Sequence, residues 1–265
     1  YGFFLPLFVG SHSVSMPPLA FMQRPYRWLK TISDFRGTHA PAPNFAYDLC
    51  ALKISEAERE ELDLHSWRVA LNGAEPIRKQ TEERFFETFA PCGLSADTLS
   101  HAFGMSEATA KVSSEHIGMA NVFLPLDPDA YEHNEARLLP SEDPRARWVA
   151  GCGVMTGDTT IAIADPDTLE RRPDSHVGEV WIKGATVAKG YFNNPEATET
   201  TFRAQLAGDG DGPYLRTGDL GFLRDGHLFI TGRLKDMIII RGQNHYPQGI
   251  EWTIGTRHPS LRPNC

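Results

Sequence analysis

The chain has 265 residues, 41% of them hydrophobic, and a formal net charge of −8. That is enough apolar material for a sizeable core and for one large domain or parts of two. Acidic and basic residues are interspersed rather than blocked, which argues against a nucleic-acid partner, because phosphates call for a basic patch.

The cysteines are scattered and form no Cys-x-x-Cys pair: Cys50, Cys92, Cys152 and Cys265. They indicate reduced thiols in a cytoplasmic protein rather than a disulfide framework or a zinc site. The apolar run 1–9 is too short to span a bilayer and lacks a basic start, so we expect no integral membrane segment. It has no initiator Met, and we interpret it as an interior strand or helix of a larger protein.

The next fifty residues carry helix signals. Pro25 is placed as the first residue of a helix. The apolar face of this helix consists of Tyr26, Trp28, Leu29 and Ile32. Pro41 and Pro43 disfavour a helix before Asn44, so a loop leads into an element that carries Phe45, Tyr47 and Leu49. Ser55 and Glu58 form a capping box at the start of a further helix.

A strand, a small-residue loop and a helix are predicted between residues 67 and 89. Trp67–Leu71 alternates like a strand, and Pro76 is placed to start the next helix. One face of that helix consists of Ile77, Thr81, Phe85 and Phe89. Such a unit lets a flat ligand lie on exposed backbone, which makes Gly73, Ala74 and Glu75 candidate contacts. A tight turn alone would need only the glycine.

The motif His101–Thr109 (HAFGMSEAT) combines an aromatic residue, a glycine and an acid. Phe103, followed by a glycine, can present its ring face to a purine. Glu107 offers a carboxylate for Mg²⁺, which prefers hard oxygen ligands. The structural alternatives are a core aromatic for Phe103 and a solvated acid at a helix start for Glu107.

The middle of the chain reads mainly as structure. Residues 124–147 contain four prolines among charged residues and predict a long surface loop. Strands are predicted at 160–164 and 178–184, and Asn194-Pro195 caps a short helix through Thr201. The Asp-Gly repeat at 208–212 lacks the spacing and closing Glu of a calcium loop.

Two polar loops alternate with strand-like runs between residues 214 and 251. The first loop is Arg216–Asp219, in which Asp219 can accept hydrogen bonds from a vicinal diol such as a ribose. The second loop is Gly232–Asp236, in which Arg233 and Lys235 suit an anionic ligand at a flexible junction. Each loop taken alone is an ordinary solvated turn, so the joint pattern carries the functional interpretation.

Taken in order, RTGDLG, GRLKD and IIIRGQNHYPQGIE resemble the adenylate-forming superfamily, whose members join a carboxylic acid to AMP. Within it the chain is most similar to the fatty acyl-AMP ligase family, and the resemblance covers essentially the whole sequence. The earlier stretches PNFAYDLC, NGAEP, HAFGMSEAT and GEVWIKG…VAKGYFNNPEAT also look like that family.

The resemblance implies roles for residues of four motifs: NGAEP, HAFGMSEAT, RTGDLG and GRLKD. Adenine would be contacted by Gly73, Ala74, Glu75 and Phe103, which stands where Tyr is usual. The same motif makes His101, Gly104 and Met105 nucleotide-binding candidates. Glu107 would bind Mg²⁺, Asp219 the ribose hydroxyls, and Arg233 ribose or phosphate. Lys235 would be the pivot of a small C-terminal domain. The candidate catalytic residues are thus Glu107, Arg233 and Lys235.

The fold expected from the same resemblance is α/β. Residues 1–234 would be the C-terminal part of a large AMP-binding domain with a β-rich subdomain. Residues 235–265 would be the hinge and the start of a small mobile domain. The family's phosphate loop would precede Tyr1 and its late catalytic lysine would follow Cys265, so we expect an inactive fragment of an active enzyme. Gly249 stands where Asp is common in the family.

The activity implied is carboxylate attack on ATP, giving acyl-AMP and pyrophosphate, with Mg²⁺ as the metal. Because segment 124–147 matches the insertion that disfavours coenzyme A in fatty acyl-AMP ligases, we expect the partners to be a fatty acid and an acyl carrier protein. The alternatives are an acyl-CoA ligase, which shares the nucleotide motifs, and a non-catalytic acyl- or nucleotide-binding module. A purely structural protein would not need polar loops of this kind in this order.

Overall fold

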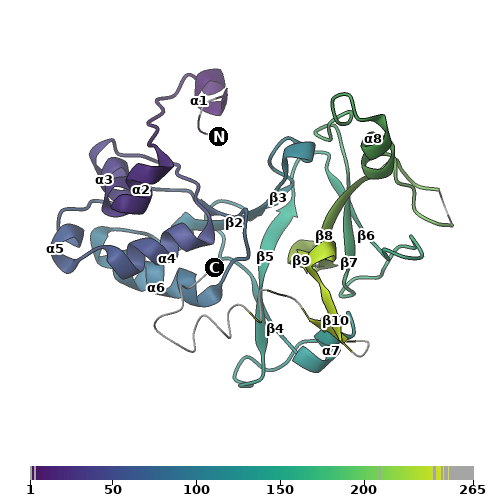
Figure 1. The fold of residues 1–265 in the computed structure, drawn as a ribbon. Helices are drawn as coiled ribbons and strands as arrows, with labels where there is room; N and C mark the ends of the chain where they lie inside the picture. The colour runs from purple at the N-terminus through teal and green to yellow at the C-terminus, as the bar shows by residue number, and fades with distance from the viewer. Residues whose placement is uncertain are drawn as a thin grey trace. The chain divides into compact units, whose positions relative to one another are not determined.

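The structure is a computed structural model and describes residues 2, 4–208, 210–240, 243–245, 247 and 250. The chain divides into two compact units. The first comprises Tyr1–Ser100 and Ile117–Ala120, and the second comprises His101–His116 and Asn121–Cys265. Helices and strands together give the mixed α/β class predicted from the sequence (Figure 1). The boundary at residue 234 stays a prediction, because most positions after Ile240, including Gly249, lie outside the described residues.

The first unit is mainly helical. Its helices are α1 (Phe4–Val9), α2 (Pro18–Gln23), α3 (Tyr26–Asp34), α4 (Asn44–Lys53), α5 (Glu56–Arg59), α6 (Lys79–Phe89) and the 3₁₀ turns η1 (Ala90–Cys92) and η2 (Ala96–Thr98). Strand β1 (Ala70–Asn72) precedes α6 and is the short outcome of the strand predicted at 67–71. The chain leaves this unit through β2 (Leu99–Phe103).

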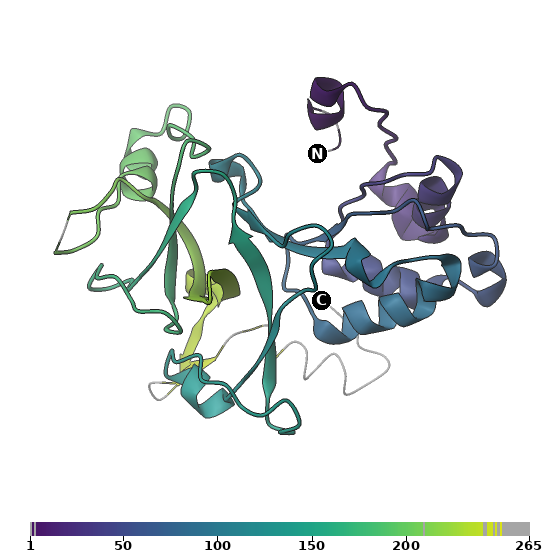
Figure 2. The ribbon, with the colours of Figure 1, turned by 180° about the vertical axis from the view of Figure 1, so that it is seen from behind.

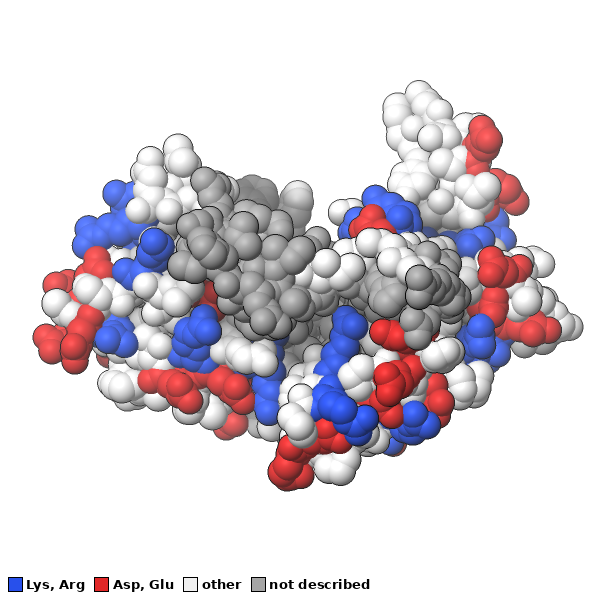
Figure 3. All heavy atoms as spheres, turned by 60° about the horizontal axis from the view of Figure 1, so that its bottom comes forward, with Lys and Arg blue, Asp and Glu red and all other residues white. Residues whose placement is uncertain are grey.

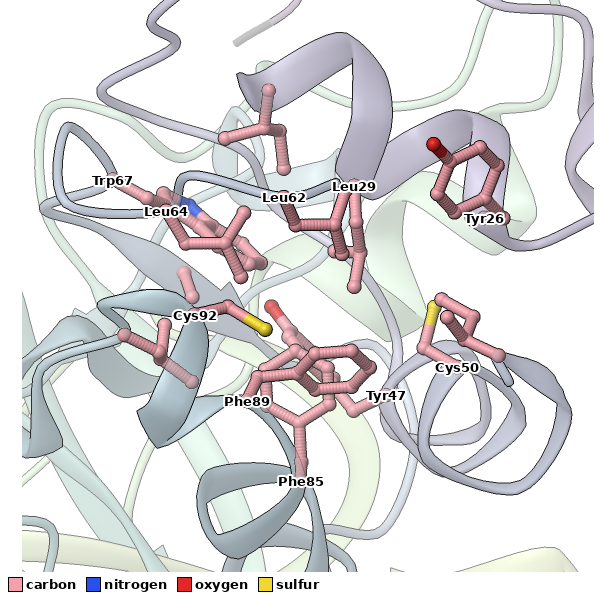
Figure 4. Close-up of a cluster of buried hydrophobic side chains, with 14 of the residues drawn as sticks. Tyr26, Leu29, Tyr47, Cys50, Leu62, Leu64, Trp67, Phe85, Phe89 and Cys92 are labelled. Carbon is pink, nitrogen blue, oxygen red and sulfur yellow. The ribbon is translucent and has the colours of Figure 1, made fainter. Parts of the chain in front are cut away.

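Aromatic side chains fill the core of the first unit (Figure 4). Tyr47 of α4 lies edge-on to Phe85 of α6, with ring centroids 5.1 Å apart. Phe85 contacts Phe89 one turn later at 4.8 Å. Trp67, beside Phe85, is buried and donates its indole N–H to Val69 O. Burying such rings dominates core energetics, so this cluster holds α4 against α6.

Two helix starts in the first unit follow the sequence signals, and one does not. The capping box of Ser55 and Glu58 is confirmed, and α3 begins one residue after Pro25. The prediction that Pro76 starts a helix is wrong, because α6 begins at Lys79. Asn44 Oδ1 accepts the Arg78 N–H at 3.1 Å, so a residue distant in sequence decides where this helix begins.

The second unit is a twisted antiparallel sheet with short helices at its edges (Figure 2). Its strand order is β2–β3–β5–β9–β8–β7–β6, with β4 paired to β5. After β2, the strands are β3 (Ser113–Ser114), β4 (Phe123–Leu126), β5 (Arg147–Met155), β6 (Thr160–Ala164), β7 (Gly178–Lys183), β8 (Leu215–Arg224) and β9 (His227–Arg233). Its helices are η3 (Ser106–Ala108), α7 (Pro128–Glu132), α8 (Pro195–Phe202) and η4 (Leu234–Asp236). A separate hairpin pairs β10 (Ile238–Ile240) with β11 (Gln243–His245).

Several further predictions from the sequence are confirmed. Strand β6 has the predicted bounds, β7 ends one residue before Gly184, and Asn194 caps α8 by accepting the Ala197 N–H at 3.1 Å. Cys50, Cys92 and Cys152 are buried free thiols, and Cys265 lies outside the described residues. Figure 3 shows basic and acidic side chains next to one another on one face, in keeping with the interspersed charge of the sequence.

Segment 124–147 is not the surface loop that its prolines predict. It contains most of β4 and all of α7, and Leu126, Tyr131 and Ala136 are buried in a common apolar cluster. Asp127 accepts two hydrogen bonds from the Arg137 guanidinium at 3.2 and 2.8 Å, which ties the start of α7 to the chain that follows the helix. The apolar residues between the prolines therefore anchor this segment to the sheet.

No helix in the described part of the chain is both long enough and apolar enough to cross a membrane.

Candidate functional site

The loop Gly73–Glu75 follows β1 in the first unit and carries backbone strain. Ala74 has a φ of 70°, in the left-handed region that residues with a Cβ seldom adopt. Glu75 accepts a short hydrogen bond from the Phe45 N–H at the start of α4. Burial raises the pKa of the Glu75 carboxyl, and the Phe45 N–H and Arg78 offset part of that rise. Strained backbone of this kind gathers at ligand sites, which keeps all three residues as candidates.

The aromatic-Gly motif of the second unit runs from the end of β2 into η3. Phe103 and Met105 are half-buried and pack against the apolar cluster of β6, β7 and β8. A Cβ at Gly104 would lie 1.5 Å from Ala110 O, so only glycine fits where the chain folds back on itself. His101 is fully buried, with Nδ1 2.9 Å from Gly151 O and its ring edge-on to Phe123. Its contacts are those of a core residue, and its role as a nucleotide contact stays a prediction.

Glu107 lies in η3 and is held by a loop that the sequence interpretation treated as structure alone. Its Oε1 accepts a hydrogen bond from the Tyr191 hydroxyl at 2.9 Å. Its backbone O accepts the Ala188 N–H at 2.8 Å, and Thr109 Oγ1 donates to Thr186 O at 2.6 Å. Loop 186–191 therefore fixes both the backbone and the carboxylate of this residue.

Asp219 and Arg233 face each other across the β8–β9 pair. They are register partners, and Arg233 Nε lies 3.3 Å from Asp219 Oδ1. The Asp219 side chain is 14% exposed and that of Arg233 is 60% exposed. Burial raises the pKa of Asp219 above its ordinary value, Arg233 lowers it in part, and the charge of Glu107 raises it further. The second unit thus brings Glu107, Asp219 and Arg233 within electrostatic reach of one another.

Arg216–Asp219 is not a free loop, as the sequence suggests, but lies within β8 at an irregular place in the strand. The register between β7 and β8 shifts between Glu179 and Trp181, opposite this stretch. Gly218 has a φ of 69° there, and Thr217 Oγ1 donates to Val180 O at 2.7 Å and accepts the Asp219 N–H at 3.0 Å. In a regular strand, successive side chains point to opposite faces of the sheet. The bulge interrupts this alternation and so changes the direction in which the polar side chains of this stretch point.

Glu179 is a residue of this region that the sequence interpretation missed. It is 2% exposed and accepts hydrogen bonds from Arg216, Trp181 and the Gly218 N–H. A signal was present in the sequence, because an acid within the apolar run Gly178–Ile182 needs a partner if the strand is buried.

Asp219→Asn is expected to keep the melting temperature within about 3 °C of wild type, or to raise it, at neutral pH. The folded-state pKa of Asp219 is raised, so the ionised carboxylate disfavours folding above that pKa. The difference between variant and wild type should shrink as the pH falls below the ordinary pKa of 3.8. Thermal melts at several pH values measure this.

The matched control for that variant is Asp225→Asn, on the turn that joins the same two strands. Asp225 is 90% exposed, and its positive φ of 50° suits Asn equally well. The control should change the melting temperature little at any pH. A fall of about 10 °C or more for Asp219→Asn alone would contradict the burial argument and make Asp219 a structural residue.

Chemically, the second unit can bind a polyhydroxyl group and offset negative charge nearby. A buried carboxylate makes strong hydrogen bonds to hydroxyls, and an exposed guanidinium beside it suits ribose or phosphate. No group of three or more His, Cys, Asp or Glu side chains able to hold a metal occurs among the described residues. Glu107 offers a carboxylate whose charge is close enough to Asp219 to raise the pKa of that residue. Lys235 is exposed in η4, the 3₁₀ turn that directly follows Arg233. Most of the predicted hinge and C-terminal domain, residues 235–265, lies outside the described residues.

Comparison with known proteins identifies the family of the chain. A family model described as AMP-binding enzyme matches residues 1–192. The chain is 48% identical over 263 residues to the medium-chain-fatty-acid–[acyl-carrier-protein] ligase JamA of Moorena producens, covering 98% of this chain and 44% of that protein. It is 40% identical over 266 residues to the ligase of the same description, TtuA, of Teredinibacter turnerae, covering 97% and 41%.

The fold comparison gives the same relationship. The crystal structure of a fatty acyl-adenylate ligase from L. pneumophila, in complex with acyl adenylate and pyrophosphate, matches with a TM-score of 0.84 and 38% identity, covering 96% of this chain and 44% of that one. The chain thus spans less than half the length of these relatives. The chain belongs to the family of AMP-binding enzymes and is a homologue of the fatty acyl-AMP ligases.

Proposed function

We propose that the protein activates a fatty acid as its acyl-adenylate and passes the acyl group to an acyl carrier protein. The observation that carries the proposal is the pair of Asp219, held nearly buried, and Arg233, exposed opposite it, with the charge of Glu107 close by. The names of JamA and TtuA support the fatty acid and carrier protein as partners, and they make medium-chain acids the first substrates to test.

In the proposed reaction a carboxylate oxygen of the fatty acid attacks the α-phosphorus of ATP. A carbon–oxygen–phosphorus linkage forms. The bond between the α-phosphorus and the oxygen that bridges it to the β-phosphorus breaks, and pyrophosphate leaves with the electron pair. Since little covalent chemistry falls to the protein, its residues act by positioning and charge. Asp219 accepts the ribose hydroxyls, Arg233 contacts ribose or phosphate, and Phe103 stacks on adenine.

The donor set of this chain fits Mg²⁺ at Glu107. Mg²⁺ commonly keeps several waters and takes one or two carboxylates together with substrate phosphates. Glu107 offers one carboxylate, oriented through Oε1 by the Tyr191 hydroxyl. When bound, the ion would offset negative charge on the phosphates. Glu107 would hold it, and the Tyr191 hydroxyl would fix the orientation of that carboxylate.

The acceptor side of the proposal depends on segment 124–147 and on Lys235. The segment is anchored by Tyr131 in the core and by the Asp127–Arg137 pair. An anchored segment can limit the movement of a domain that swings about Lys235, which supports a carrier protein rather than coenzyme A as the acceptor. Rotation about Lys235 would present the acyl-AMP carbonyl to the phosphopantetheine thiol.

The proposal is tested with the full-length gene product that carries this sequence, ATP, Mg²⁺ and fatty acids of graded length. Hydroxylamine traps the adenylate as a hydroxamate, and pyrophosphate release is followed in parallel. We expect both products in equal amounts, dependent on the fatty acid. We also expect Asp219→Asn to weaken ATP binding by about 10- to 100-fold, with Asp225→Asn as control. Nucleotide binding without hydroxamate from any acid would instead indicate a binding module.

A further inference from the structure

Glu179 lies in β7, outside the motifs that the proposed reaction uses, and its carboxylate is almost completely withdrawn from solvent. Its exposed fraction is 2%. Oε2 accepts the Trp181 indole N–H at 2.9 Å and the Arg216 guanidinium at 2.9 and 2.7 Å. Oε1 accepts the Gly218 N–H at 3.1 Å. A buried charge is costly unless it is paired and hydrogen-bonded, and here both oxygens are used.

Three of these bonds go to Arg216 and Gly218, which lie within the three residues before Asp219. Gly218 is in the left-handed region with a φ of 69°, and its N–H points to β7 where the two strands change register. A backbone N–H in a bulge has no ladder partner, so the Glu179 carboxylate takes the place of the missing strand acceptor. Arg216, on the other side of Thr217, is bound by the same carboxylate.

We propose that Glu179 is the positioning residue for the Asp219 carboxylate, because its hydrogen bonds with Gly218 and Arg216 hold the bulge of β8 in place. The inference rests on the proposed ribose-binding role of Asp219. Glu179 itself contacts no substrate. Its task is to fix the backbone from which Asp219 reaches the two ribose hydroxyls, so that the hydrogen-bonding geometry exists before the nucleotide arrives.

Only a carboxylate satisfies every donor at this position. Glutamine would offer one acceptor oxygen and turn an NH₂ group either toward the Gly218 N–H or toward Arg216 and Trp181. Glu179→Gln therefore disturbs the bulge without changing the volume of the side chain. Trp181→Phe is the matched control, since it removes one donor to Oε2 but keeps the Gly218 and Arg216 bonds.

The test compares binding of AMP with binding of 2′,3′-dideoxy-AMP, which lacks both ribose hydroxyls, to the full-length gene product by calorimetry. Wild type should prefer AMP by about tenfold or more, because hydrogen bonds to a charged acceptor are lost with the analogue. Glu179→Gln should bring this ratio close to one and leave the affinity for the analogue unchanged. Trp181→Phe should keep the wild-type ratio.

A second variant keeps the test decisive if Glu179→Gln does not fold. Glu179→Met/Arg216→Met removes both charges together. Replacing a buried ion pair by apolar side chains is often neutral for stability, and the double variant still deletes the acceptor for the Gly218 N–H. The ratio should again approach one. In the double variant Glu179→Gln/Asp219→Asn, no further loss should appear beyond that of Asp219→Asn.

The outcomes separate the inference from the proposal beneath it. An unchanged ratio in Glu179→Gln, or a parallel fall in affinity for AMP and for the analogue, would leave Glu179 a merely structural residue and overturn the inference alone. If wild type does not distinguish AMP from its dideoxy analogue, the ribose assignment of Asp219 fails, and the inference fails with it.

Discussion

Glu107→Gln is expected to slow acyl-adenylate formation by about 10²- to 10³-fold in the full-length gene product. The substitution keeps the size of the side chain and the acceptor for the Tyr191 hydroxyl but removes the negative charge. In the proposed reaction that charge would help to hold Mg²⁺, which would supply positive charge to offset the phosphates. Pyrophosphate release at saturating ATP and fatty acid measures the effect.

The matched control is Glu196→Gln, an exposed acid in the first turn of α8. It should leave the rate within about twofold of wild type, as is usual for an exposed charge away from the site. The rate of Tyr191→Phe should lie between the rates of those two variants, since it keeps the charge of Glu107 but loses the hydrogen bond that orients the Glu107 carboxylate. A Glu107→Gln protein that keeps its rate would contradict the assignment of Glu107 as the metal-holding acid.

Gly104→Ala is expected to destabilise the fold by at least about 3 kcal/mol. The added Cβ would lie 1.5 Å from Ala110 O and 2.6 Å from its carbonyl carbon, so rigid backbone rather than a movable side chain opposes it. The strain would fall between Phe103 and Glu107 and would displace both. Chemical denaturation, read as the free energy of unfolding, measures the loss.

Gly157→Ala serves as the control for this variant. Gly157 has a φ of 64°, but its added Cβ would meet no atom within 4 Å. It should therefore cost only the roughly 1–2 kcal/mol of placing an L residue in the left-handed region. Equal losses for the two variants would show that the close approach of Ala110 does not decide the identity of residue 104.

Short-range signals predicted the local elements of this chain well. The Ser55–Glu58 box and the Asn194 cap act over three residues, so sequence alone contains what decides them. The start of α6 depends on Asn44, and the course of β8 depends on Glu179, each more than thirty positions away. Such partners come together only in the folded chain, and local secondary-structure propensity does not predict them.

The candidate site shows the same division. The motifs named Asp219, Arg233 and Glu107, and the second unit sets Asp219 opposite Arg233 with the charge of Glu107 in reach. They did not indicate Tyr191 or Glu179, which orient those side chains from neighbouring segments. Segment 124–147 was misjudged for a related reason: its prolines and charges suggested a loop, while a few apolar residues such as Tyr131 anchor it.

The most direct test of the account is the fate of the acyl-adenylate in the full-length gene product. After one turnover with ATP, Mg²⁺ and a medium-chain fatty acid, coenzyme A and a phosphopantetheinylated carrier protein are supplied in separate reactions, and acyl-AMP, acyl-CoA and acyl-carrier protein are quantified. We expect acyl-AMP to accumulate, to persist with coenzyme A and to be consumed by the carrier protein. Rapid conversion to acyl-CoA would contradict the proposed acceptor and assign the protein to the acyl-CoA ligases.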